Sequence, residues 1–118
     1  MNALQQAHWC AHYALEKKAQ DVCILHLTPL SSLTDYLILA TGTSDRHVQA
    51  IAESIRLDLK QHHQISPLAI EGMEEGRWVL LDYGDLMVHV FQQTVRSFYD
   101  LEGLWAEAKR IEPAPPQA

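Results

Sequence analysis

The stretch "TDYLILATGTSDRHVQAIAESIRLDL", residues 34–59, decides the fold because its hydrophobic pattern changes within a few residues. Residues 34–41 form a short apolar run that is typical of a strand covered on both faces. After Gly42, the hydroxyl-rich segment 43–45 can cap a helix. Apolar residues then follow a 3.6-residue period, which predicts a helix with one buried stripe. That stripe consists of Val48, Ile51, Ala52, Ile55 and Leu59.

Shorter elements precede this stretch. Leu4, Ala7, Ala11 and Leu15 stand at helical spacing and predict a first helix over residues 3–18. The run "DVCILHL", residues 21–27, then predicts a strand, and "TPLSS" has the proline and serines of a loop.

Three more strands and a helical region are predicted after residues 34–59. The segment "LAIEG" at 68–72 predicts a short strand, and "WVLLDYGDLMVHVF" at 78–91 predicts a β-hairpin whose turn uses the conformational freedom of Gly84. Residues 93–110 predict a helical region that Gly103 interrupts.

The order α-β-β-α-β-β-β-α predicts an α/β fold, a mixed β-sheet flanked by helices. We expect one domain over residues 1–111 and a disordered, proline-rich tail over residues 112–118.

Composition narrows the range of functions. The chain has 118 residues and a net charge of −6, with 15 acidic and 9 basic residues. Nucleic-acid binding is disfavoured because no dense basic cluster is present, whereas a basic protein partner would be attracted. No segment has the length of a membrane span or the pattern of a signal peptide, so we expect a cytoplasmic protein. Two cysteines without CxxC spacing indicate neither a disulfide framework nor a zinc site.

The enzymatic alternative rests on "ATGTS", residues 40–44, because a strand, a glycine turn and a helix start can bind an anion, as in nucleotidyltransferases. Those enzymes also need two carboxylates that alternate on one strand to hold Mg²⁺. No such pair exists: Asp45 and Asp58 are far apart on the helix, and Asp82 and Asp85 are three residues apart around a turn.

The seven histidines do not complete a site either. His8 and His12 could share a metal on one helix face, but no third ligand is close in sequence, so we expect no metal and no cofactor. His47 is interpreted as a helix-start residue, and His89 as a hydrogen-bonded histidine within an apolar strand.

The hairpin itself is the remaining candidate site. Alternation places Trp78, Leu80 and Asp82 on one face and Val79, Leu81 and Tyr83 on the other. Trp78 can be core, with Asp82 and Asp85 serving the turn. Alternatively, Trp78 is an exposed anchor rimmed by acids, which suits a basic protein. The acids between residues 71 and 85 are Glu71, Glu74, Glu75, Asp82 and Asp85, against the single Arg77.

The ordered motifs carry a resemblance to a known family. The runs "LTDYLILATGTSDRHVQAIAESI" at 33–55, "WVLLDYGDLMVHVF" and "SFYDLEGLW" resemble the Iojap family of ribosomal silencing factors, RsfS, over about residues 3–108. The resemblance implies a fold similar to nucleotidyltransferases without their catalytic carboxylates. It also implies a non-enzymatic protein that binds the large ribosomal subunit through its protein fourteen. By blocking the small subunit from joining, such a protein lowers translation when nutrients are scarce.

The resemblance places the ribosome-contacting region on the hairpin. It assigns Trp78 as the aromatic anchor and Tyr83, Gly84 and Asp85 as the turn that meets the partner, with Asp82 as a neighbour. Tyr83 replaces an aliphatic residue of some members, and Gly103 stands where relatives commonly carry a basic residue. The sequence leaves open whether the free protein forms a homodimer.

Overall fold

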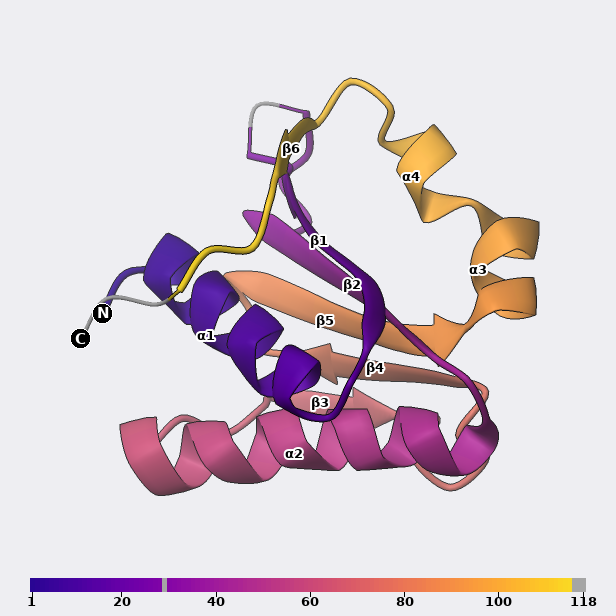
Figure 1. Ribbon diagram of the computed structural model, residues 1–118. Coiled ribbons are helices and arrows are strands. Elements are labelled where there is room, and N and C mark those ends of the chain that lie inside the picture. The colour runs from indigo at the N-terminus through magenta and orange to yellow at the C-terminus, as the bar shows by residue number, and fades with distance from the viewer. Residues whose placement is uncertain (29, 116–118) are drawn as a thin grey trace.

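A six-stranded mixed sheet lies at the centre of the computed structural model, which describes residues 1–28 and 30–115 (Figure 1). The strand order is β3-β4-β5-β2-β1-β6. In the described chain, β2 and β5 pair in parallel at the middle of the sheet and the other neighbours are antiparallel. The predicted mixed sheet is therefore confirmed. The strands are β1 (Gln20–His26), β2 (Tyr36–Gly42), β3 (Ala69–Glu71), β4 (Trp78–Asp82), β5 (Leu86–Gln92) and β6 (Lys109–Ile111).

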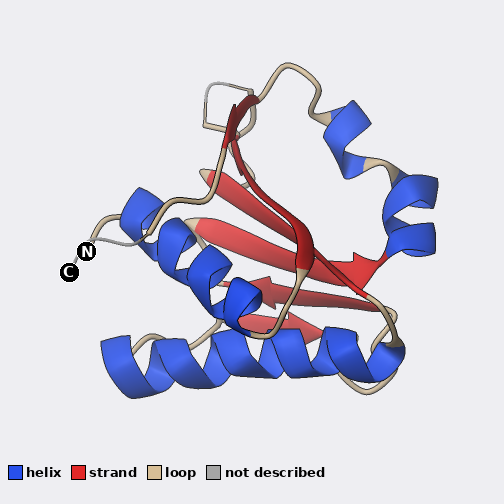
Figure 2. Cartoon of the chain, in the orientation of Figure 1, coloured by secondary structure: helices blue, strands red, loops and turns tan. Residues whose placement is uncertain are grey.

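Helices cover the two faces of the sheet unequally (Figure 2). The long helices α1 (Ala3–Glu16) and α2 (Asp45–His63) pack on one face over a large apolar core. The short helices α3 (Gln93–Tyr99) and α4 (Leu101–Leu104) belong to a smaller apolar cluster on the other face. This unequal cover leaves part of the second face uncovered by helices.

The strand-to-helix stretch folds as its pattern predicts. Every residue of the predicted stripe on α2 is fully buried, and the Ser44 hydroxyl caps the helix by accepting a hydrogen bond from the backbone N–H of His47 at 3.1 Å. Strand β2 is covered on both faces, with Ile38 in the larger core and Leu39 in the smaller cluster.

Helix α1 is shorter than predicted. It ends at Glu16 because Lys18 adopts a left-handed backbone conformation with φ of 62°, and Ala19 donates back to the Ala14 carbonyl at 3.2 Å. The prediction that Leu15 shares the apolar stripe is wrong, because Leu15 is 48% exposed. Tyr13 is buried instead, since the helix faces both the sheet and α2.

The C-terminal region differs most from prediction. The helix is interrupted at Asp100, whose φ of 46° ends α3, whereas Gly103 lies inside α4. The Asp100 carboxylate accepts the Gly103 N–H at 3.0 Å and so starts the next helix. Lys109 and Arg110, predicted as the end of the helical region, instead form β6 with Ile111 on the edge of β1, where Ile111 pairs with Ile24. Free backbone groups on that edge override local helix preference.

A buried guanidinium fixes α3 to the sheet. Arg96 is 4% exposed and donates to the Asp21 carbonyl at 2.7 Å and to the Thr41 hydroxyl at 2.8 Å. It also forms a forked pair with Glu102 at 2.8 and 3.1 Å, which ties α4 to the same point. The pairing with Arg96 lowers the pKa of the Glu102 carboxyl. Nothing in the sequence pattern indicated this network.

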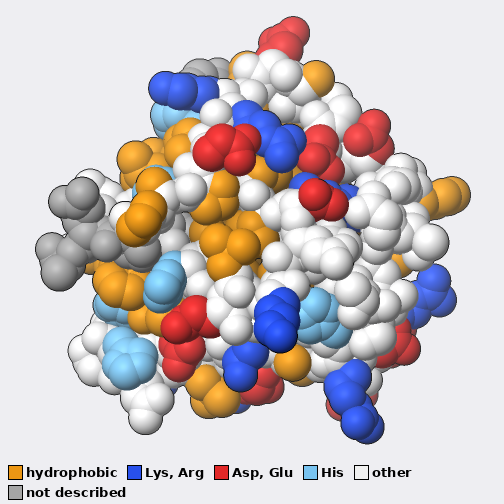
Figure 3. All heavy atoms as spheres, viewed as in Figure 1, with side chains coloured by type: hydrophobic (Ala, Val, Ile, Leu, Met, Phe, Trp, Pro, Cys, Tyr) orange, Lys and Arg blue, Asp and Glu red, His pale blue; other side chains and the backbone are white. Residues whose placement is uncertain are grey.

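Residues 112–115 continue from β6 without helix or strand and run beside α1, where the Ala114 N–H lies 3.3 Å from Nδ1 of His8. The rest of the predicted tail, residues 116–118, lies outside the described residues. Over α1, apolar side chains and histidines gather on the surface (Figure 3). Within the described residues, no helix combines the length and apolar character needed to cross a membrane.

Candidate functional site on the open sheet face

The part of the sheet that the helices leave open is built from alternate residues of β4 and β5. On β4, Val79 and Leu81 are buried against α1 and α2, whereas Trp78, Leu80 and Asp82 are partly exposed. On β5, Met87 and His89 are partly exposed on the same side, since Met87 pairs with Asp82 and His89 with Leu80. The predicted alternation is therefore confirmed. This set, called here the open face, consists of Trp78, Leu80, Asp82, Met87 and His89.

Trp78 lies at the edge of the open face, between core and solvent. Its ring centroid is 5.8 Å from that of buried Phe91 and 4.7 Å from that of exposed Tyr99. Its indole Nε1 donates a hydrogen bond of 2.9 Å to Nδ1 of His89. Trp78 therefore has features of both a core residue and an exposed anchor, because one side of its ring packs on the small cluster and the rest is accessible.

His89 is held neutral at this site. Burial lowers the pKa of His89 to about 4, because an imidazolium would lose hydration there. Nδ1 accepts the indole proton of Trp78, so the ring carries its own proton on Nε2. His89 is thus the hydrogen-bonded histidine that was predicted, and it supports the orientation of Trp78.

This pKa gives a testable pH dependence of stability. Between about pH 6.5 and pH 4 the unfolded chain protonates His89 and the folded chain does not, so stability falls as the pH falls. We expect His89 to contribute about 3 kcal/mol to this loss and nothing above about pH 7. His89→Gln keeps an acceptor for Trp78 but cannot titrate. Urea unfolding from pH 7 to 4.5 should show a shallower slope in His89→Gln, and identical slopes would contradict the pKa.

The turn residues between β4 and β5 are used differently from one another. The Asp82 carboxylate accepts the Gly84 N–H at 2.8 Å and stabilises the turn, and Gly84 has the left-handed φ of 83° that the tight turn needs. The Thr34 hydroxyl donates to the Gly84 carbonyl at 2.9 Å and anchors the turn to the loop before β2. Asp85 is the last residue of the turn before β5 and is exposed.

Tyr83 faces away from the open face. Its side chain packs on the larger core, and its hydroxyl is buried without a hydrogen-bond partner in the described part of the chain. Burial raises the pKa of the Tyr83 phenol. The structure therefore brings Trp78 and Asp82 onto one face, about 13 Å apart along the strand. Gly84 and Asp85 lie at the tip, whereas the partly buried Tyr83 side chain packs toward the larger core.

Acidic side chains lie around this end of the sheet: Glu71 pairs with Leu80 of the open face and Glu75 lines a hollow with Trp78, whereas the Glu74 carbonyl accepts a hydrogen bond from Gln49 of α2. Glu71 on β3 and both Glu74 and Glu75 in the following loop are exposed, as is Asp85. In the described part of the chain none of these four carboxylates takes part in an ion pair. An uncompensated negative rim around apolar groups favours a basic partner by long-range attraction.

The glycine turn before α2 is occupied by structural contacts. His47 accepts the Thr43 N–H with Nδ1 at 2.9 Å, and its Nε2 lies 2.7 Å from the Lys17 carbonyl. Both ring nitrogens of His47 are therefore engaged, one within the start of α2 and the other at the end of α1. Across residues 1–28 and 30–115, no three His, Cys, Asp or Glu side chains gather as a metal site would require.

Sequence reasoning missed the part of the surface that comes from outside the hairpin. Phe98 and Tyr99 on α3 are 81% and 55% exposed, and Tyr99 extends the aromatic surface of Trp78. Met87 could have been found from alternation along β5. Phe98 and Tyr99 could not, because only the packing of α3 brings them beside β4.

Comparison with known proteins places this geometry in a family. The family model described as "Ribosomal silencing factor during starvation", RsfS, matches residues 1–118. Ribosomal silencing factor RsfS of Bacillus subtilis is 43% identical over 93 residues, which cover 79% of this chain and 78% of that protein. The mouse protein named "Mitochondrial assembly of ribosomal large subunit protein 1" is 29% identical over 93 residues, covering 76% of this chain and 40% of that protein.

A solved structure agrees with the fold. The crystal structure of a Chromobacterium violaceum protein superposes with a TM-score of 0.87 at 34% sequence identity, covering 98% of this chain and 96% of that one. A small α/β domain with an open, acid-rimmed sheet face has the features of a protein-binding module. The chain belongs to the RsfS family of ribosomal silencing factors, as the resemblance of its motifs predicted.

Proposed function

We propose that this protein binds the large ribosomal subunit, through its protein fourteen, and sterically prevents the small subunit from joining. In this way it lowers translation during nutrient limitation, in the cytoplasm and without turnover of a substrate. The observation that carries the proposal is the open face, where Trp78 stands half-buried within a rim of unpaired carboxylates in a chain of this family. The mouse relative's name, which refers to the ribosomal large subunit, supports the choice of subunit.

The mechanism is occlusion by a bound domain. The apolar open face would be desolvated on the partner, with Trp78 supplying the largest contact area, as aromatic anchors do at protein interfaces. Gly84 and Asp85 at the turn tip, together with the acids of the rim, would meet basic side chains and speed association. Inhibition is then stoichiometric and saturates once the protein exceeds its dissociation constant.

The nucleotidyltransferase alternative has little support from the geometry. Asp82 is engaged by the turn amide, Asp85 is in solvent, and Asp45 lies at the start of α2. These carboxylates do not converge in the manner that two-metal phosphoryl transfer requires.

Trp78→Ala tests the proposal directly. We expect the variant to bind purified large subunits about 30-fold more weakly, a loss of about 2 kcal/mol, because the anchor of the face is removed. In a sedimentation assay of subunit joining, saturating wild-type protein should leave little joined ribosome, and the variant should need a correspondingly higher concentration.

The control for this experiment is folding, because Trp78 also packs on Phe91 and Tyr99. Binding is therefore measured at a temperature where the variant is shown to be folded. Asp85→Lys provides a second variant with an exposed side chain, and it should slow association mainly at low salt. Full subunit joining in the presence of saturating wild-type protein would refute the proposed function. Unchanged binding by both variants would refute the proposed face.

A further inference from the structure

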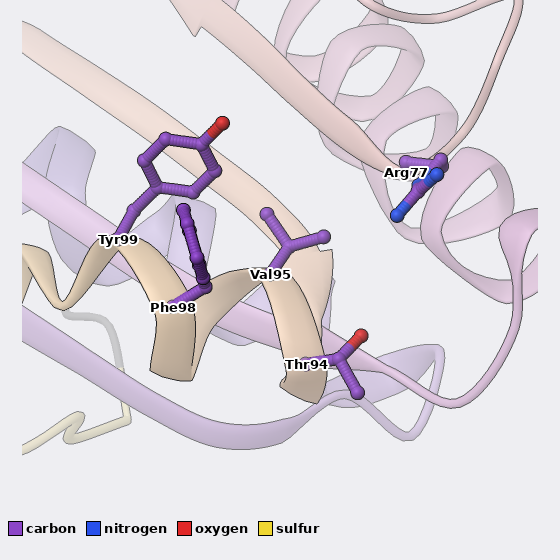
Figure 4. Close-up of a pocket in the computed structure, with 5 residues that line it drawn as sticks. All are labelled: Arg77, Thr94, Val95, Phe98 and Tyr99. Atoms are coloured by element: carbon purple, nitrogen blue, oxygen red, sulfur yellow. The ribbon is translucent and has the colours of Figure 1, made fainter.

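A groove runs between α3 and the start of β4, next to Trp78. One hollow of about 320 Å³ is lined by residues of α3 and by Arg77, and a second of about 330 Å³ reaches to Gly72 and Glu75. The two hollows share Arg77, Val95 and Tyr99, so they form one continuous depression. Figure 4 shows Val95, Phe98 and Tyr99 on α3 and Arg77 facing them from across the groove. We call this depression the α3 groove: Gly72, Glu75, Arg77, Val95, Phe98 and Tyr99.

The walls of the α3 groove carry exposed aromatic side chains. The rings of Phe98 and Tyr99 meet edge to face with centroids 5.0 Å apart, and Phe98 is 81% exposed. The same short helix buries Val95 and Arg96, so its orientation is fixed and both rings are held outward. Two exposed aromatic rings beside a hollow are typical of a surface that receives an apolar side chain.

The groove is continuous with the open face through one aromatic contact. Tyr99 belongs to both hollows and packs against Trp78 with the ring planes tilted by 49°, and Trp78 itself lines the second hollow. A partner that covers Trp78 would therefore also cover the near end of the groove.

Charge identifies the chemistry of the occupant. The loop that forms the far wall carries Glu74 and Glu75 and follows Glu71, whereas the groove has one cation, Arg77. The three carboxylates make no ion pair within residues 1–28 and 30–115, so they are available to basic groups of a partner.

We propose that the α3 groove receives a loop of the ribosomal partner that has one apolar anchor flanked by Lys or Arg. The anchor packs beside Phe98 and Tyr99 and over Val95, in the hollow that Arg77 closes from the other side, and the flanking cations face the Glu71–Glu75 segment. This inference rests on the proposed function and extends its interface from the hairpin onto α3.

Phe98→Ala is the test, with binding to purified large subunits as the readout. Because Phe98 is largely solvent-exposed, the variant should keep the wild-type melting temperature and bind about tenfold more weakly. Leu57→Ala is the matched control, since Leu57 is also an exposed apolar residue at 48% but lies on α2. If the wild type binds and Phe98→Ala binds with the same affinity, the inference about the α3 groove is wrong while the proposed function stands. Failure of the wild type to bind removes the proposed function and the inference together.

Arg77→Glu tests the charge of the occupant. A more acidic groove should bind a basic loop several-fold more tightly at low salt, and the gain should shrink as ionic strength rises. Weaker binding would show that the occupant is not basic and would overturn the inference. Sedimentation of the free protein identifies another occupant: self-association that Phe98→Ala abolishes would mean that a second copy fills the groove, which also contradicts it.

Discussion

Replacing Arg96 with Ala is expected to lower the free energy of unfolding by about 3 to 5 kcal/mol. The guanidinium is almost fully buried, and it satisfies the Asp21 carbonyl, the Thr41 hydroxyl and the Glu102 carboxylate. Its removal leaves the Asp21 and Thr41 acceptors without their donor and leaves Glu102 with the more distant Arg110 alone, at 3.5 Å, which costs more than the lost contacts alone. Urea unfolding should show a lower midpoint, and the melting temperature should fall by about 10 °C or more.

Two variants separate the network from charge in general. Arg96→Lys keeps the charge but cannot make the forked pair, so it should be destabilised by an intermediate amount. Arg46→Ala removes an exposed cation near the start of α2 and should change stability by less than about 0.5 kcal/mol. If Arg96→Ala had the same melting temperature as the wild type, this network would not anchor α3. The fixed orientation of the aromatic residues of α3 would then need another cause.

Ile55→Ala is expected to cost about 2 to 5 kcal/mol of stability. Ile55 is fully buried on the face of α2 that packs against the sheet, so truncation removes apolar burial and leaves a cavity. Thermal and urea unfolding measure the loss. Below its melting transition the variant should still bind large subunits as the wild type does, because this residue lies on the opposite side of the sheet from the open face.

Leu57→Ala on the same helix is the control for helix propensity. Leu57 is half exposed, so its truncation should cost far less than that of Ile55. A stable Ile55→Ala protein that failed to bind the ribosome would contradict the core assignment and make this helix face an interface.

The site was only partly predictable. Alternation along "WVLLD" placed Trp78 and Asp82 together and Tyr83 opposite, because a strand has a strict two-residue period. It did not show that Asp82 is engaged by Gly84 or that the Tyr83 ring enters the larger core. Those outcomes depend on the turn geometry and on the position of α1 and α2, which no local pattern contains.

The sequence by itself determined the α/β class, the buried strand β2 and the stripe of α2, because hydrophobic period is a local property that burial then enforces. Tertiary structure alone decided how the last third of the chain folds and packs. Residues 109–111 become a strand since the edge of β1 offers them hydrogen bonds, and Arg96 is buried since acceptors from distant strands converge on it. Tyr99 reaches Trp78, and Phe98 lies beside it in the α3 groove, for the same reason: contacts between residues far apart in sequence fix where α3 lies, and no single segment contains them.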